Sequence, residues 1–186
     1  MRLWLMSMLI VVPLFGFSYS PLLLKAQASI FPKLLLLAKE PQKLLVQGSI
    51  VFAIVHEAED TLTASILKSL MEQQYKGRIE GYPFKIILIQ YSELNETVEA
   101  SAVMALHSEK HINEPARLAV KKQMVSFVEN AAYLKEGYLF ALNLERSTVI
   151  YMNKTMLPYY GIEFSDTLYH VVRFFDENKK SAFPLH

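Results

Sequence analysis

The stretch SIVFAIV, residues 49–55, decides which fold the chain is expected to adopt. After Ser49 it is a continuous apolar run, rich in β-branched residues and without polar alternation. Such runs are typical of strands that are covered on both faces, as in a parallel sheet between layers of helices. We therefore expect a central buried strand here.

Helix and strand patterns alternate on both sides of this run. Upstream, PLLLKAQASIFPKLLLLAKE, residues 21–40, predicts a buried helix that Pro32 bends or splits, because proline has no amide hydrogen to donate. Downstream, Asp60 is expected to cap a second helix. The core stripe of that helix is predicted from Leu62, Ile66, Leu67, Leu70 and Met71. Further strands are expected at residues 84–90, 101–107 and 124–128.

The C-terminal part predicts a hairpin followed by a helix. The segment LFALNLERSTVIYMN, residues 139–153, contains two strand patterns that a short charged bend separates. After Gly161, which is expected to end a short helix, Ser165 caps the last helix, DTLYHVVRFF. The inward-facing residues of this last helix are predicted to be Leu168, Val171, Val172 and Phe175. The predicted class is α/β: a layered sandwich with a mixed, mainly parallel sheet flanked by helices and a C-terminal antiparallel hairpin plus helix.

The composition narrows the possible partners. The chain has 186 residues, of which 52% are hydrophobic, as expected for one globular domain. Its 19 basic and 18 acidic residues leave a formal charge of +1, so we do not expect it to bind nucleic acid. It has no cysteine, which excludes disulfides and thiolate metal sites.

The N-terminal stretch MRLWLMSMLIVVPLFGFSYS has the layout of a secretory signal peptide. A positive charge at Arg2 precedes an apolar run, and the small residues Gly16 and Ser18 favour cleavage before Tyr19. An uncleaved membrane anchor is the alternative, although spanning a bilayer needs about 20 residues. We expect a signal peptide at 1–18, one periplasmic domain at 19–176 and a flexible C-terminal tail at 177–186.

The segment HEAED, residues 56–60, is a candidate ligand loop. It follows the first predicted strand, and ligands of open α/β sheets bind at the carboxyl ends of strands. His56, Glu57 and Glu59 are the candidate ligand-binding residues. The alternative is a polar loop whose last acid caps the next helix.

Motifs for catalysis and cofactors are weak. His107 and His111 have the spacing of a helical zinc pair, but they follow a strand, where that spacing means little, and a solvated loop is the favoured reading. The six glycines form no phosphate-binding pattern, and no nucleophile elbow is present. We therefore predict that the chain is not an enzyme and that it has no cofactor or metal.

Aromatic residues near the C-terminus suggest a surface that contacts another protein. His170 and Phe174 share a face of the last predicted helix, away from its core stripe, and Tyr159 and Tyr160 adjoin it. Exposed aromatic patches are common at interfaces. Ordinary packing against the first helix is the alternative.

The segment GYLFALNLERSTVIYMNKTMLPYYGIEFSDTLYHVV resembles the most recognisable part of YfiR-like proteins. In that family a strand–turn–strand of the form I-N-F-x-L-E-x-G-x-V-R-F-x-I-N precedes a helix, a glycine and I-x-[IF]-S-S-x-L-L. The counterparts here are Leu139, Phe140, Leu142, Glu145, Val149, Tyr151, Asn153, Gly161, Ile162, Phe164, Ser165 and Leu168. Asp166 replaces the second serine and Pro158 interrupts the short helix, which indicates a divergent member.

The resemblance implies a periplasmic α/β domain that forms homodimers and acts by protein contact. Such a domain binds the extracytoplasmic sensor region of a membrane protein, typically a diguanylate cyclase, and other members lie near histidine kinases. Binding holds the cyclase inactive, lowers cyclic-di-GMP and restrains biofilm formation, and the membrane is reached only through the partner. Two alternatives stay open: a small-molecule-binding sensor that uses the loop at HEAED and works with a histidine kinase, and, more weakly, a hydrolase.

Overall fold

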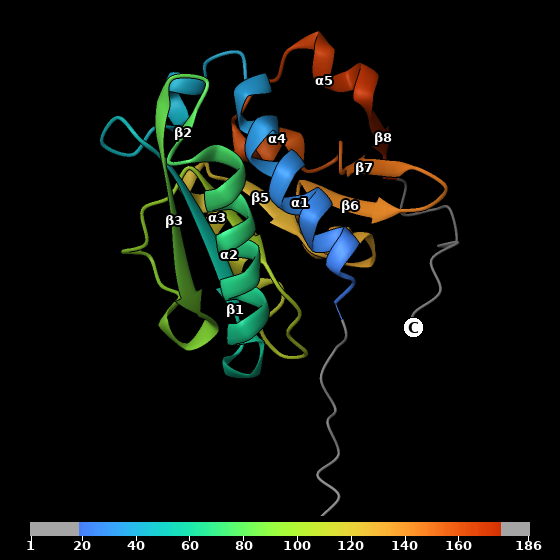
Figure 1. Ribbon diagram of the computed structural model, residues 1–186. Coiled ribbons are helices and arrows are strands. Elements are labelled where there is room, and N and C mark those ends of the chain that lie inside the picture. The colour runs from blue at the N-terminus through green and yellow to red at the C-terminus, as the bar shows by residue number, and fades with distance from the viewer. Residues whose placement is uncertain (1–18, 176–186) are drawn as a thin grey trace, which may run out of the picture.

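The computed structural model describes residues 19–175, which form a mixed, mainly parallel sheet between helices (Figure 1). The strand order is β2-β3-β1-β4-β5-β6-β7-β8. The strands are β1 (Ile50–His56), β2 (Arg78–Ile79), β3 (Tyr82–Gln90), β4 (Ala102–Ala105), β5 (Val125–Val128), β6 (Phe140–Leu144), β7 (Thr148–Met152) and β8 (Val172–Phe174). The helices are α1 (Pro21–Leu34), α2 (Thr61–Tyr75), α3 (Glu114–Lys122), α4 (Leu157–Tyr160) and α5 (Asp166–Val171). The predicted fold class is confirmed.

Parallel pairing holds the centre of the sheet, and antiparallel pairing is confined to its ends. β3, β1, β4, β5 and β6 run in one direction, whereas β2 pairs antiparallel with β3 and β7 pairs antiparallel with β6. The crossovers through α2 and α3 lead in opposite directions along the sheet. Because such crossovers are right-handed, these two helices cover opposite faces. α1 packs beside α2, and α3 packs against β4 and β5 with α4 next to it.

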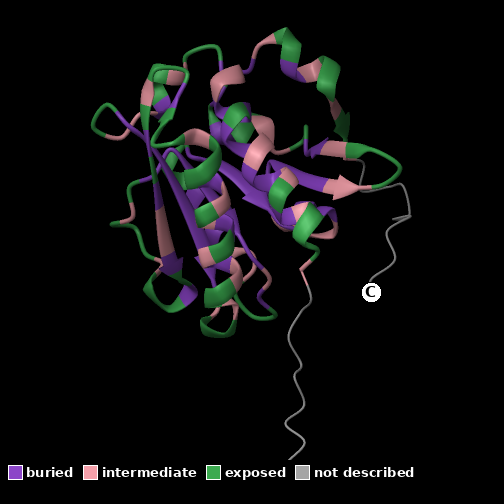
Figure 2. Cartoon of the chain, in the orientation of Figure 1, coloured by how far each residue is buried: buried purple, intermediate pink, exposed green. Residues whose placement is uncertain are grey.

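The run at 49–55 forms the buried centre, as its composition predicts. Every residue of β1 is buried, and Figure 2 shows burial concentrated on the central strands. A row of phenylalanine rings crosses the sheet beneath α1. The ring centroid of Phe127 lies 4.6 Å from that of Phe31, 5.5 Å from that of Phe52 and 5.6 Å from that of Phe140. Phe127, on β5, therefore joins α1 to β1 and β6.

The helix after Asp60 turns a different face to the core from the predicted one. Leu67 and Met71 are buried, as expected, but Leu62 is 73% exposed and Ile66 is also exposed. Ala64 takes the third core position of α2. The spacing pattern predicted that Leu62 and Ile66 would be buried. The small side chain of Ala64 instead allows α2 to pack closely against α1 and the sheet.

The last predicted helix is only half helical. α5 ends at Val171, and the chain continues as β8, which pairs in parallel with β7. Val171, predicted to face inward, is exposed. Without β8, the outer edge of β7 would leave backbone N–H and C=O groups unpaired. β8 pairs with these groups, and its β-branched Val172 favours the strand conformation. The first helix differs less: Pro32 lies inside α1, which ends two residues later and continues as the turn Leu35–Leu37.

Within residues 19–175, no helix has the length and apolar character needed to span a bilayer. The predicted signal peptide at 1–18 and C-terminal tail at 177–186 lie outside the described residues, as does residue 176, the predicted last residue of the domain.

Replacing Phe127 by alanine should lower the free energy of unfolding by about 3–5 kcal/mol, because the ring fills a fully buried position in contact with three others. Urea denaturation followed by circular dichroism measures this loss. Phe174→Ala, at an exposed position of β8, is the matched control and should cost less than about 1 kcal/mol. Equal losses in the two variants would contradict the central role of Phe127.

Candidate functional site

The carboxyl ends of the parallel strands bring the polar loops of the chain to one edge of the sheet. The loops after β1, β4 and β5 begin at residues 57, 106 and 129, and the chain enters α1 at the same edge through Tyr19. In Figure 1 this edge lies at the bottom, where the β3 arrowhead and the first turn of α2 are seen. Ligands of open α/β sheets bind at such an edge.

The predicted ligand loop contributes two of its three residues to this edge. Ser108 donates a hydrogen bond to the Glu57 carboxylate, and its Oγ accepts one from the backbone N of His111 at 3.0 Å. His56 is buried at the end of β1, with its Nδ1 2.7 Å from the backbone O of Glu57. Glu59 is exposed and lies outside this network.

Tyr19 connects α1 to the same edge. Its hydroxyl donates to Asp60 Oδ2 at 3.2 Å and accepts from the backbone N of His107 at 3.1 Å. The Nδ1 of His107 lies 2.8 Å from the hydroxyl of Tyr133, which comes from the loop after β5. Burial raises the pKa of Asp60, and its hydrogen bond from Tyr19 partly offsets that rise.

Glu129, directly after β5, is the most unusual residue of the site. Its backbone is fixed, because its N donates to Ala105 O at 3.2 Å and its O accepts from Gln27 Nε2 at 2.9 Å. The side chain is only 8% exposed, and its carboxyl group has no hydrogen-bond partner among residues 19–175. Burial, with a smaller contribution from the charge of Asp60, raises the pKa of Glu129 to about 8. The carboxyl group is therefore mainly protonated at neutral pH.

Four tyrosines lie close enough to this carboxyl group for its charge to affect their pKa values. Burial is the largest cause of the raised pKa of each, and a negative Glu129 adds to the rise in all four. They are Tyr19, Tyr91, Tyr133 and Tyr138. Hydroxyls of this kind stay neutral and serve as hydrogen-bonding groups, not as bases.

The histidine pair considered for zinc is otherwise engaged. The Nδ1 of His111 lies 2.8 Å from Glu114 Oε1, and His107 faces Tyr133 as described above. In the part of the chain that the structure describes, no group of three or more His, Cys, Asp or Glu residues is placed to hold a metal ion.

The predicted partner surface is only partly assembled. Tyr159 is 66% exposed, and His170 and Phe174 are also exposed. Tyr160 was predicted wrongly, because its ring is fully buried and its hydroxyl donates to Gly137 O at 2.8 Å. The shared helical face of His170 and Phe174 is also wrong, since Phe174 belongs to β8. Lys154 Nζ lies 5.1 Å above the Phe174 ring.

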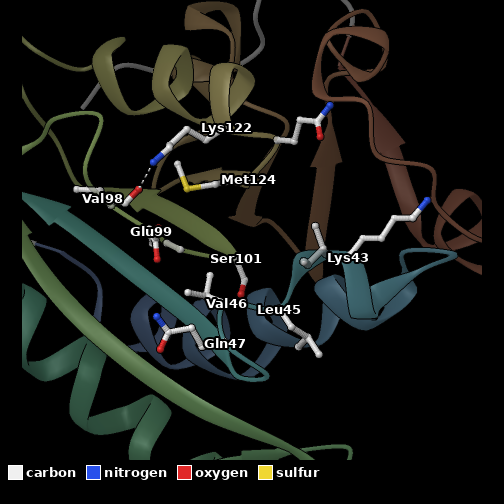
Figure 3. Close-up of a pocket in the computed structure, with 12 residues that line it drawn as sticks. Lys43, Leu45, Val46, Gln47, Val98, Glu99, Ser101, Lys122 and Met124 are labelled. Carbon is white, nitrogen blue, oxygen red and sulfur yellow. Dashed lines mark hydrogen bonds between the residues drawn. The ribbon is translucent and has the colours of Figure 1, made fainter.

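A pocket of about 360 Å³ lies at the opposite, amino edge of the sheet (Figure 3). It is lined by the segments that precede β1, β4 and β5. Its two lysines already have partners: Lys43 pairs with Glu40 at 2.5 Å, and Lys122 Nζ donates to the backbone O of Glu96 and of Val98. Gln27 Oε1, a buried acceptor without a hydrogen-bond partner, belongs to the carboxyl edge, where Gln27 Nε2 binds the backbone O of Glu129, and we therefore take this edge as the candidate site.

Sequence reasoning found His56 and Glu57 but missed Gln27 and Glu129. An acid that directly follows the apolar strand pattern MVSFV was the available signal for Glu129. Nothing in the sequence indicates that Gln27, 102 residues away, contacts it.

No family model matches the chain, and no curated protein matches it. Solved structures do. A conserved domain protein from Vibrio cholerae O1 biovar El Tor is 11% identical, with a TM-score of 0.59 over 82% of this chain and 60% of that one. An ABC domain in complex with L-Trp from Streptococcus pneumonia is 10% identical, with a TM-score of 0.51 over 81% of this chain and 59% of that one. The chain thus spans about 60% of the length of each, and the likeness shows the fold.

Glu129→Gln should flatten the pH dependence of stability. The folded protein keeps the proton of Glu129 up to about pH 8, whereas the unfolded chain loses it near pH 4.5. Between these values the unfolded state binds fewer protons, so wild-type stability falls as pH rises, by up to about 1.4 kcal/mol per pH unit. Glutamine resembles the protonated acid and avoids this loss.

Urea midpoints measured at about pH 5, 6.5 and 8 test this linkage. The variant should match wild type at the lowest pH and exceed it increasingly above. Glu59→Gln, in an exposed position, is the control and should follow the wild-type curve. Parallel curves for wild type and Glu129→Gln would show that the carboxyl group is not held protonated.

Proposed function

We propose that the chain is a non-enzymatic, small-molecule-binding sensor domain of the periplasm, and that its ligand binds at the carboxyl edge of the parallel sheet. The observation that carries this proposal is the buried, unpaired carboxyl group of Glu129 at the edge where α/β sheets bind their ligands. A buried polar group without a partner is costly in a purely structural role, and functional sites are where such groups are retained.

The neighbouring groups support binding in preference to turnover. Raised pKa values keep the tyrosine hydroxyls protonated, which makes them poor general bases. Ser108 donates to Glu57, and His111 contacts the Ser108 hydroxyl through its backbone N and not through the imidazole that an activating base would use. The Streptococcus structure described above, in complex with L-Trp, supports a binding role for this fold.

A second candidate function is the contact-based regulation that the resemblance to YfiR-like proteins implies. The supporting observation is that the surface of the C-terminal elements exposes three large apolar side chains: Tyr159 of α4, Val171 of α5 and Phe174 of β8. On this proposal, the surface contacts the sensor region of a membrane-bound diguanylate cyclase or histidine kinase, and homodimers are the active form. Ligand binding at the carboxyl edge would then shift the affinity for that partner.

A thermal-shift screen of the purified protein tests the binding proposal. The probes are the twenty amino acids, together with neutral sugars and dicarboxylates as other ligand classes. A ligand present at about 100 times its Kd should stabilise the fold by about 2.7 kcal/mol and raise the Tm. Glu57→Gln should reduce that rise, whereas Lys43→Ala, in the pocket at the amino edge, should leave it unchanged. A flat response to every class would contradict a binding function.

The regulatory proposal predicts that the exposed residues Tyr159 and Phe174 affect partner binding independently of the ligand site. Tyr159→Ser combined with Phe174→Ser should abolish cross-linking to a membrane protein and raise cellular cyclic-di-GMP as much as deletion does. The urea midpoint should change little, because both side chains are exposed. Leu62→Ser, on the exposed face of α2, is the control. An unchanged nucleotide level in the deletion strain would remove the cyclase version.

A further inference from the structure

Gln27 and Glu129, which one hydrogen bond joins at the carboxyl edge, each have an acceptor group to which no donor is bonded. Gln27, on α1, is fully buried and uses its Nε2 to bind the backbone O of Glu129, but its Oε1 accepts no hydrogen bond. The carboxyl group of Glu129 likewise has no partner among the described residues. The bond between the two residues keeps these acceptors in the same neighbourhood.

The surrounding hydroxyl groups do not supply the missing donor. Tyr91 donates to the backbone O of Leu106, Tyr138 donates to the backbone O of Ile112, and Tyr19 donates to Asp60. Each phenol has one proton, and these three protons are already committed. The hydroxyl of the fourth tyrosine, Tyr133, lies 2.8 Å from His107 Nδ1, so none of the four hydroxyls is bonded to the carboxyl group of Glu129.

The acids of this edge have no lysine or arginine partner among the described residues. Burial raises the pKa of Asp60, and the cationic side chains that act on Asp60 to offset part of that rise are His56 and His107. Glu57, Asp60 and Glu129 lie in neighbouring loops, and the ion pairs within residues 19–175 place no lysine or arginine on any of them. Opposite charge within a few ångströms is what favours the ionised form of a buried acid. Aromatic side chains around such a site also suit an organic cation, whose charge is attracted to ring faces.

We propose that Glu129 and Gln27 bind the ammonium group of a small organic cation, with Glu57 and Asp60 adding a favourable field. The inference rests on the proposed binding function and names the chemical class of its ligand. An ammonium group brings three donors and one positive charge, which match the two unpaired acceptors and the unpaired acid. A bare metal ion fits less well, because the described residues place no group of three ligands together.

Binding of such a cation should release a proton. Below about pH 8 the free site holds the carboxyl proton of Glu129, and the bound site holds the carboxylate against the ammonium group. The proton leaves to solvent as the ion pair forms, so affinity should rise by up to tenfold per pH unit until about pH 8. A ligand that binds elsewhere would show neither effect.

Isothermal titration calorimetry with charge-matched pairs of probes tests the proposal. The pairs are tryptamine with indole-3-propionate and putrescine with adipate, titrated near pH 6.5 in phosphate and in ACES, two buffers that differ in their heat of ionisation. At least one amine should bind at least about tenfold more tightly than its matched acid and release close to one proton. Glu129→Gln should abolish the proton release and weaken the amine about tenfold or more.

Controls separate this inference from the binding function itself. Glu59→Gln removes an exposed acid of the same edge and should leave affinity and proton release unchanged. Gln27→Leu should weaken the amine but retain the proton release. Acids that bind as well as amines, amines that bind without releasing a proton, or no binding by either amine would overturn the inference. The proposed function would still stand in each case if the thermal-shift screen finds another ligand.

Discussion

Parallel pairing of β1, β4 and β5 is the constraint on which the rest of the structure depends. Because these strands run in one direction between two layers of helices, the residue that follows each one arrives at a single edge, already partly removed from water. This is why Glu57 and Glu129 share an electrostatic environment although they are far apart in the sequence. If β4 ran antiparallel to its two neighbours, the loop after it, which carries His107 and Ser108, would lie at the opposite edge from Glu57 and Glu129.

The position of α1 determines which polar groups come together at this edge. Phe31, near the end of the helix, stacks on the central Phe127 and fixes the helix over the sheet. Gln27, one turn earlier, then reaches the backbone of Glu129, and Tyr19, just before the helix, reaches Asp60. The same contacts that close the core therefore determine which polar groups meet, so the geometry of the site depends on the packing of one helix.

Local patterns predicted the layers of the fold but not all of its contacts. The apolar run of β1 and the two strand patterns of the hairpin depend on neighbouring residues, and both form where expected. Helical spacing, by contrast, shows that a stripe exists but not what packs against it, which is why Leu62 and Tyr160 were misplaced. For the site, His56 and Glu57 follow directly from the end of a strand. The pairing of Gln27 with Glu129 depends on tertiary packing across 102 residues, and no local signal carries it.

The two edges of the sheet show why a hollow and a binding site need not coincide. The pocket at the amino edge has volume, but its lysines are matched by a carboxylate and by backbone carbonyls, so a polar ligand would have to displace bonds that already exist. At the carboxyl edge a ligand would gain interactions that the protein alone leaves unmade, at Glu129 and at Gln27. Burying the unpaired carboxyl group of Glu129 lowers the stability of the folded domain. A bound cation would remove this penalty, so cation binding would stabilise the domain. Such a link is what a sensor requires, because the ligand then changes the free energy of the state that a partner recognises.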